Sequence, residues 1–185
     1  SLKGLTSMGN AMGRLIWRLV PSRRNMAIES IMKHLGKSRA EAERIAFESF
    51  CHNGRSFLEI VLTRSFGLES PNLRFDPPEL FEELKNCQRP IVAATAHFGS
   101  WELLASLLGQ VYEEPRPRMV VVRRYANLAV QEFIASCREA TGAEMVGHRQ
   151  AAMGVIRALH KNGIAAFLVD HNAMRREAEF MPFLN

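Results

Sequence analysis

The residues best suited to chemistry in this sequence are His97 and Glu102, which lie five positions apart in the segment HFGSWE. An imidazole has an unperturbed pKa of about 6.5, close to cellular pH, so it suits the role of general base. A carboxylate bonded to one ring nitrogen fixes the tautomer and leaves the other nitrogen to accept a proton. The pair therefore predicts proton abstraction from an alcohol that attacks a carbonyl carbon. The same spacing also fits a structural histidine bonded to a backbone carbonyl, with Glu102 favouring a helix N-terminus.

For this pair to form, a strand must end just before His97 and a helix must begin just before Glu102. Gly99 permits a tight turn between the two elements, and Ser100 is suited to cap the helix. Glu102 then falls in the first helical turn, from which its carboxylate can reach back toward the imidazole.

The segment 87–185 alternates between short apolar runs and stretches of helical pattern. The apolar runs cover 91–96, 119–122, 143–146 and 164–169, and helices are expected over 101–110, 127–141 and 150–162. This alternation predicts an α/β fold with a mostly parallel sheet flanked by helices. Ligands of such sheets bind at the carboxyl ends of the strands. Polar residues stand at three of these ends: His97 after the first run, Arg123 after the second and Asp170 after the fourth.

The segment 1–86 is expected to be helical apart from a loop over 67–75. Pro21 interrupts the first helix, and Gly36 is suited to end the second. Two capping boxes are expected to open further helices: Ser38 with Glu41, and Asp76 with Glu79, the latter with Pro77 at the first helical position.

The formal net charge of +5 is concentrated at the N-terminus. Residues 1–24 carry Lys and Arg side chains but no acid, and the rest of the chain has equal numbers of both signs. This pattern argues against a nucleic-acid binder, whose charge usually covers a docking face. The arm also has apolar residues on one helical face: Met8, Met12, Leu15, Ile16 and Leu19. Such a helix lies on an anionic membrane surface or docks on the protein's own core.

The composition is that of an ordinary globular protein, with 185 residues of which 47% are hydrophobic and 23% charged. This length favours a single domain over 1–185. The three cysteines are too scattered for a disulfide scaffold and lack the spacing of metal ligands, which indicates a reducing compartment and no metal site. No run of 18 apolar residues is present, so no membrane-spanning helix is expected within these residues.

Five segments resemble, in order along the chain, the motifs of the bacterial lipid A biosynthesis late acyltransferases, the lauroyl and myristoyl transferases. HFGSWELLA resembles their signature, in which a histidine is followed five positions later by an acid, as throughout the lysophospholipid acyltransferase superfamily. VVRRYAN resembles the Y-R-P-x-x-N stretch at Arg123 and Asn127, and REATGA resembles R-x-x-x-G at Arg138 and Gly142. LVDHN resembles the D-Q-N motif at Asp170, and FMPFLN resembles F-V-P-F-F-G.

Three places depart from the family's pattern. Val122-Arg123-Arg124 stands where the family has Tyr-Arg-Pro, His171 replaces a glutamine, and Asn185 replaces a glycine. Family members usually continue beyond this point, so we expect the domain to be incomplete at its C-terminal end.

The resemblance implies transfer of a fatty acyl group from an acyl-carrier-protein or acyl-coenzyme A thioester to a hydroxyl of a lipid A precursor. The expected location is the cytoplasmic face of the bacterial inner membrane. His97 would be the general base and Glu102 its orienting carboxylate, while Arg123, Asn127 and Asp170 would bind substrate. No cofactor is implied, and no covalent acyl-enzyme is needed because a thioester is already activated. The alternatives are the same chemistry on another glycolipid acceptor, a soluble thioesterase, or a non-catalytic module that binds lipid at a membrane surface.

Overall fold

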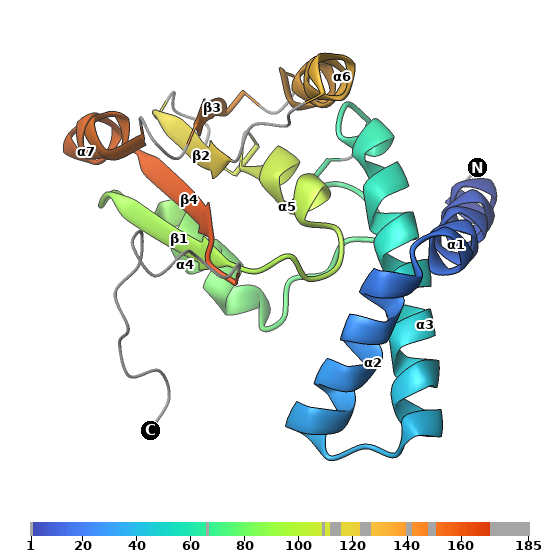
Figure 1. Ribbon diagram of the computed structural model, residues 1–185. Helices are drawn as coiled ribbons and strands as arrows, with labels where there is room; N and C mark the ends of the chain where they lie inside the picture. Colours follow the sequence, from blue (N-terminus) through green and yellow to red (C-terminus); the bar gives the residue numbers. More distant parts are fainter. Residues whose placement is uncertain are drawn as a thin grey trace.

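Three long helices pack together on one side of the molecule, and a parallel sheet with its covering helices forms the other side (Figure 1). The computed structural model describes residues 2–65, 67–108, 110–111, 116–122, 127–139, 142–147 and 151–170. The three helices are α1 (Leu2–Leu19), α2 (Pro21–Leu35) and α3 (Arg39–Leu58), and the short 3-10 helix η1 (Glu59–Leu62) follows α3. The expected helical N-terminal region is therefore confirmed.

The boundaries of these helices follow the local signals in the sequence. Pro21 is the first residue of α2, and Gly36 ends that helix in the left-handed conformation with φ 61°. The Ser38 hydroxyl accepts a hydrogen bond from the Glu41 backbone N–H at 3.3 Å, and the Glu41 carboxylate accepts one from the Ser38 N–H at 3.1 Å. The capping box predicted at the start of α3 is thus confirmed.

Helix α1 packs against α3 through glycines and Trp17 rather than through its apolar stripe. The Trp17 ring lies edge-on to Phe47 and Phe50 of α3, with ring centroids 5.5 Å and 5.2 Å away. A Cβ added at Gly13 would lie 2.4 Å from the Phe50 carbonyl oxygen, and one at Gly54 would lie 2.2 Å from the carbonyl oxygen of Gly9. No side chain fits at such distances, so the two backbones approach this closely only because these positions are glycine.

The apolar stripe of α1 therefore lies outside this helix–helix contact. Leu15 is 55% exposed and Leu19 is 69% exposed, and Met8 and Ile16 are exposed as well. The face of α1 that carries Gly9 and Gly13 docks on the protein, while every stripe residue except the half-buried Met12 is exposed. Among the described helices, none is both long enough and apolar enough to cross a membrane.

The strands form a parallel sheet whose spatial order differs from their order along the chain. They are β1 (Ile91–Thr95), β2 (Arg118–Val122), β3 (Glu144–Gly147) and β4 (Ile164–Leu168), arranged β1-β4-β2-β3. Helix α4 (Pro78–Asn86) precedes β1, and α5 (Trp101–Leu107), α6 (Leu128–Glu139) and α7 (Ala151–His160) connect the strands. All pairings of the described strands are parallel. Each predicted strand is confirmed to within one residue at either end, and so is the α/β class.

Helices cover both faces of the sheet, as buried parallel strands require. Met119 in β2 is level with Ala165 in β4, and its side chain lies against Gly154 of α7. Ile164 is the neighbour of Ala165 along β4, so it points to the other face. There it packs with Val111 and with residues of α4 and the end of α5. Helix α7 thus covers one face, and α4 with α5 covers the other.

The capping box expected at Asp76 and Glu79 is wrong. Helix α4 begins at Pro78, and its N-cap residue Pro77 makes no side-chain capping hydrogen bond. Pro77 is extended, with φ −75° and ψ 149°. The physical reason is the second proline, because a proline disfavours the helical region for the residue before it. Pro78 therefore takes the first helical position that the sequence analysis gave to Pro77.

Candidate active site

His97 and Asp170 meet at the carboxyl end of the sheet because β1 and β4 are neighbours. The register pairs Thr95 with Leu168, and the Val169 backbone N–H donates to the Thr95 carbonyl at 2.9 Å. His97 and Asp170 each lie two residues beyond the paired position, one on each strand. The sheet therefore brings an imidazole and a carboxylate to the same place.

The Asp170 carboxylate holds His97 at two points. Its Oδ1 lies 2.8 Å from the ring Nδ1, and its Oδ2 accepts a hydrogen bond from the His97 backbone N–H at 3.0 Å. The backbone bond fixes the carboxylate, and the ring bond then fixes the orientation of the imidazole. When Nδ1 donates its proton to Asp170, Nε2 is the ring nitrogen that can accept a proton from a substrate.

The surroundings of the pair favour an ionised Asp170 beside an accessible ring. The hydrogen bond from the His97 ring lowers the pKa of the Asp170 carboxyl below its ordinary value, and the His97 backbone N–H adds to this against the opposing effect of burial. The His97 and Asp170 side chains are 29% and 36% exposed. The Trp101 ring lies edge-on to the imidazole, with ring centroids 5.1 Å apart. Gly99, with φ 59°, makes the turn expected between strand and helix.

Glu102 has a different partner from the one that its spacing to His97 suggests. Its Oε2 accepts a hydrogen bond from Nε of Arg138 in α6 at 2.8 Å, and its Oε1 accepts a second from Nη2 of the same guanidinium. Within the described residues, the carboxylate bonded to the His97 ring belongs to Asp170. The structure thus corrects the expected contact between Glu102 and His97 and shows a bridge from α5 to α6 in its place.

The burial of Glu102 explains this pairing. Glu102 lies in the first turn of α5, as expected. The side-chain cap predicted at Ser100 is wrong, since the Ser100 side chain makes no capping hydrogen bond. The Glu102 and Arg138 side chains are only 8% and 13% exposed. A carboxylate removed from water needs an opposite charge and hydrogen bonds to offset its desolvation, and a guanidinium fork supplies both. The bridge ties the start of α5, and with it the turn that follows His97, to α6.

The other predicted site residues have separate outcomes. Asn127 caps α6, because its Oδ1 accepts a hydrogen bond from the Val130 backbone N–H at 3.1 Å. Its role in binding substrate stays a prediction. Arg123 lies outside the described residues, as does His171. Sequence reasoning placed Asp170 at a strand end but missed its contact with His97, which depends on β4 lying beside β1.

A family model described as bacterial lipid A biosynthesis acyltransferase matches residues 3–185, which is almost the whole chain. The chain belongs to this family. The resemblance inferred from the five motifs is therefore confirmed, and the protein is an acyltransferase. A comparison with curated proteins finds no match. In this member of the lipid A biosynthesis acyltransferase family, the histidine of the HFGSWE segment follows the end of β1, and the glutamate of the same segment joins α5 to α6.

Proposed function

We propose that this acyltransferase moves a fatty acyl group from an acyl-carrier-protein thioester to a hydroxyl group of a lipid A precursor, with His97 as general base. The observation that carries the proposal is the hydrogen-bonded pair of His97 and Asp170 at the carboxyl end of the sheet. An oriented imidazole that is partly open to solvent suits a proton transfer to and from a substrate.

In this mechanism the acceptor hydroxyl gives its proton to Nε2 of His97 as its oxygen attacks the thioester carbonyl carbon. The carbon–sulfur bond then breaks, and the leaving thiolate takes the proton back from the imidazolium. Asp170 stabilises the imidazolium between the two steps and holds the ring in position. The enzyme itself carries no acyl group, which agrees with the absence of a G-x-S-x-G nucleophile motif from the sequence.

Two apolar side chains beside the pair give the acyl chain a place to start. Phe98 follows His97 and is almost fully exposed, and Val169 precedes Asp170 and is also exposed. Burying such side chains against a hydrocarbon chain is favourable by about 25 cal/mol per Å² of apolar surface. We assign the phosphate groups of the acceptor to Arg123, since guanidinium groups bind phosphate as a bidentate fork. Asn127 follows Arg123 closely in the chain and is assigned to the same acceptor.

The exposed stripe of α1 supports a location at the inner surface of the bacterial inner membrane. The glycine face of α1 is taken up by α3, whereas Leu15 and Leu19 are exposed and Arg14 and Arg18 lie exposed beside them. Apolar side chains flanked by cations suit an anionic lipid surface, where each cation contributes about 1 kcal/mol.

The catalytic proposal is tested with His97→Ala and His97→Gln in the full chain. We expect both variants to lose acyl transfer by about 10²–10⁴-fold, because neither side chain can act as the base. Products are identified by mass spectrometry from an acyl-carrier-protein donor, an acyl-coenzyme A donor and a panel of glycolipid acceptors. Undiminished transfer by a folded variant would contradict the role of His97, and release of free fatty acid in place of acylated lipid would contradict transfer itself.

The membrane proposal is tested by cosedimentation with anionic phosphatidylglycerol vesicles. We expect Leu15→Glu combined with Leu19→Glu to weaken binding by about tenfold or more, because each leucine contributes on the order of 1.5–3 kcal/mol when buried. The matched control is Leu80→Glu with Met153→Glu, which changes two exposed apolar residues on α4 and α7. Equal binding of both double variants would contradict docking through α1.

A further inference from the structure

The imidazole of His97 is held at one nitrogen by Asp170, but this bond does not by itself fix the plane of the ring. The χ2 torsion of a histidine is broad rather than staggered, so the side chain has no sharply preferred ring plane of its own. The 2.8 Å contact between Nδ1 and Asp170 Oδ1 directs one ring nitrogen, and hydrogen bonds tolerate a range of angles. A second contact that opposes tilting of the ring would hold Nε2 in one direction.

Trp101 makes such a contact with the imidazole. The centroids of the two rings lie 5.1 Å apart, and the ring planes are inclined by 68°. Both values fit an edge-to-face aromatic pair, in which the positive edge of one ring meets the negative face of the other. This attraction depends on the angle between the planes as well as on the distance, so it opposes tilting of the His97 ring.

Trp101 is itself held in place by the start of α5. It is the first residue of that helix, and the Leu104 backbone N–H donates to the Ser100 carbonyl at 3.1 Å to close the turn around it. The next residue, Glu102, is bonded through both carboxylate oxygens to Arg138 in α6. A side chain can orient a functional group when its own position is fixed by packing and hydrogen bonds. The buried bridge gives the indole this support, and it thereby links Glu102 to His97 through Trp101.

The other tryptophan of the sequence shows a structural indole in the same protein. Trp17 packs edge-on to Phe47 and Phe50 of α3, and the Arg24 guanidinium lies over its ring. Trp101, in contrast, is half-buried at the carboxyl end of the sheet, and its described ring partner is the proposed base.

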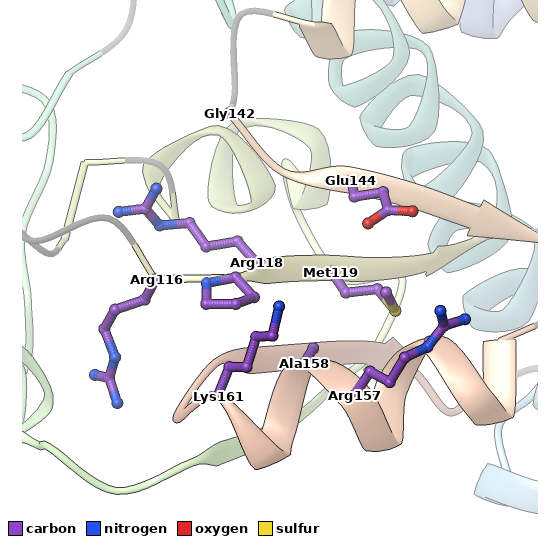
Figure 2. A pocket seen from close by; sticks show the side chains of 10 residues that line it. Arg116, Arg118, Met119, Gly142, Glu144, Arg157, Ala158 and Lys161 are labelled. Atoms are coloured by element: carbon purple, nitrogen blue, oxygen red, sulfur yellow. The ribbon is translucent and has the colours of Figure 1, made fainter.

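The opposite end of the sheet gives His97 no support. Figure 2 shows a hollow there, between α7 and the amino ends of β2 and β3, with Arg157, Lys161 and Met119 in its walls. The 5 residues of β2 alone span roughly 16 Å at about 3.3 Å per residue, so these side chains lie far from His97. None of the described residues that line this hollow is aromatic. The aromatic contact with the imidazole is supplied by α5.

We propose that Trp101 is a positioning residue, which fixes the plane of the His97 imidazole so that Nε2 faces the acceptor hydroxyl. This role depends on the function of His97 as general base that is proposed above. A ring already held in the reactive orientation need not be ordered when the hydroxyl arrives, which favours proton transfer. Because the indole acts on the base rather than on the substrate, its removal should change kcat and leave KM largely unchanged.

The kinetic test compares Trp101→Leu, which removes the ring, with Trp101→Phe, which keeps an aromatic edge and face. We expect Trp101→Leu to lower kcat by about two- to tenfold, the loss that corresponds to one edge-to-face pair. Trp101→Phe should retain most of the rate. In a His97→Gln background, Trp101→Leu should have no further effect on kcat, because the indole acts through the imidazole.

The matched control for the loss of a half-buried ring is Phe75→Leu. This change removes one member of the stacked pair of Phe75 and Phe81, whose centroids lie 3.7 Å apart. We expect Phe75→Leu to transfer acyl groups at the native kcat, and urea denaturation shows that each variant is folded. Native kcat in Trp101→Leu, an equal fall in Phe75→Leu, or an undiminished loss in the His97→Gln background would each overturn the role of Trp101.

A spectroscopic test of the same contact needs no substrate. The sequence has 2 tryptophans, so Trp17→Phe leaves Trp101 as the sole source of indole fluorescence. A protonated imidazole in contact with an indole quenches its emission. We expect the emission of Trp17→Phe to fall as the pH is lowered through the titration of His97, and we expect the same protein with His97→Gln to lack this step. The same profile in both proteins would overturn the contact between the two rings.

The failure of this role and the failure of the proposed function give different results. Undiminished transfer by His97→Gln would contradict the general base itself. Loss of transfer in His97→Gln together with native kcat in Trp101→Leu would leave the base in place and overturn the role of Trp101 alone.

Discussion

The two carboxylates that follow β1 and β4 show how differently one site can use the same chemical group. Glu102 is buried and bonded to Arg138 through both of its oxygens. Asp170 is about a third exposed and bonded to the ring and the backbone of His97. The glutamate is close to the histidine in sequence, yet the aspartate, 73 residues away, holds it. Proximity along the chain is thus a poor guide to pairing when strands distant in sequence lie side by side.

The difference assigns the two carboxylates different kinds of work. A buried ion pair that is broken on one side leaves a charge without compensation, so Glu102 is expected to matter first for folding. An exposed pair contributes little to stability, so Asp170 is expected to matter first for the chemistry of His97.

The largest effect is expected for Glu102→Ala. This change should lower the free energy of unfolding by about 3–5 kcal/mol, because the buried Arg138 guanidinium loses its carboxylate. Urea denaturation of the full chain measures the change, with Asp170→Ala as the matched comparison, for which we expect a loss below about 1 kcal/mol. Replacing both partners, Glu102→Leu with Arg138→Met, should recover most of the stability. Equal losses for the two alanine variants would remove the contrast between the carboxylates.

A smaller effect, on rate rather than stability, is expected for Asp170→Asn. We expect kcat to fall by about 10²-fold, the lower end of what a positioned base contributes, because the ring loses its charged partner. In a His97→Ala background the same change should have almost no further effect, since the two residues act as one unit. Steady-state transfer assays on the four proteins check this. If the fold-losses in kcat of the two single variants multiplied in the double variant, Asp170 would act independently of His97.

The smallest effect concerns the dependence of stability on pH. The pKa of Asp170 is lowered in the folded state, chiefly by the hydrogen bond from the His97 ring. Its contribution to stability is therefore present above the ordinary carboxyl pKa of about 3.9 and is lost as the pH falls through the lowered value. The difference in unfolding free energy between the native protein and Asp170→Asn should shrink as the pH falls below about 4, where Asp170 takes up its proton. Urea titrations across this range would contradict the assignment if the difference did not change.

Much of the fold follows from local signals. Apolar runs such as 91–96 and 164–169 mark the buried parallel strands, and the Ser38 capping box and Gly36 mark helix ends, because each depends on neighbouring residues only. The error at Asp76 and Pro77 has a local cause as well, in the preference of one proline for an extended residue before it.

The site was less predictable because its contacts depend on strand order. His97 and Asp170 were both expected at strand ends, but no pattern in the sequence indicates that β4 lies between β1 and β2. The same limit applies to α1, where the apolar stripe is evident but the docking face is made by Gly9 and Gly13 together with Trp17. Small residues give a weak periodic signal, so the close approach of the α1 and α3 backbones left little trace in the hydropathy pattern.

Thr95 of β1 and Leu168 of β4 lie level with each other in the sheet. The two short segments beyond them, 96–97 and 169–170, form overhangs whose lengths must match for His97 to meet Asp170. One residue inserted into either overhang would advance its end by about 3.3 Å and turn the following side chain toward the opposite face. The imidazole and the carboxylate would then part, although every helix and strand remained intact. Only insertions or deletions of equal size in both overhangs keep the two ends level, so natural length variation in these two loops should occur in matched steps.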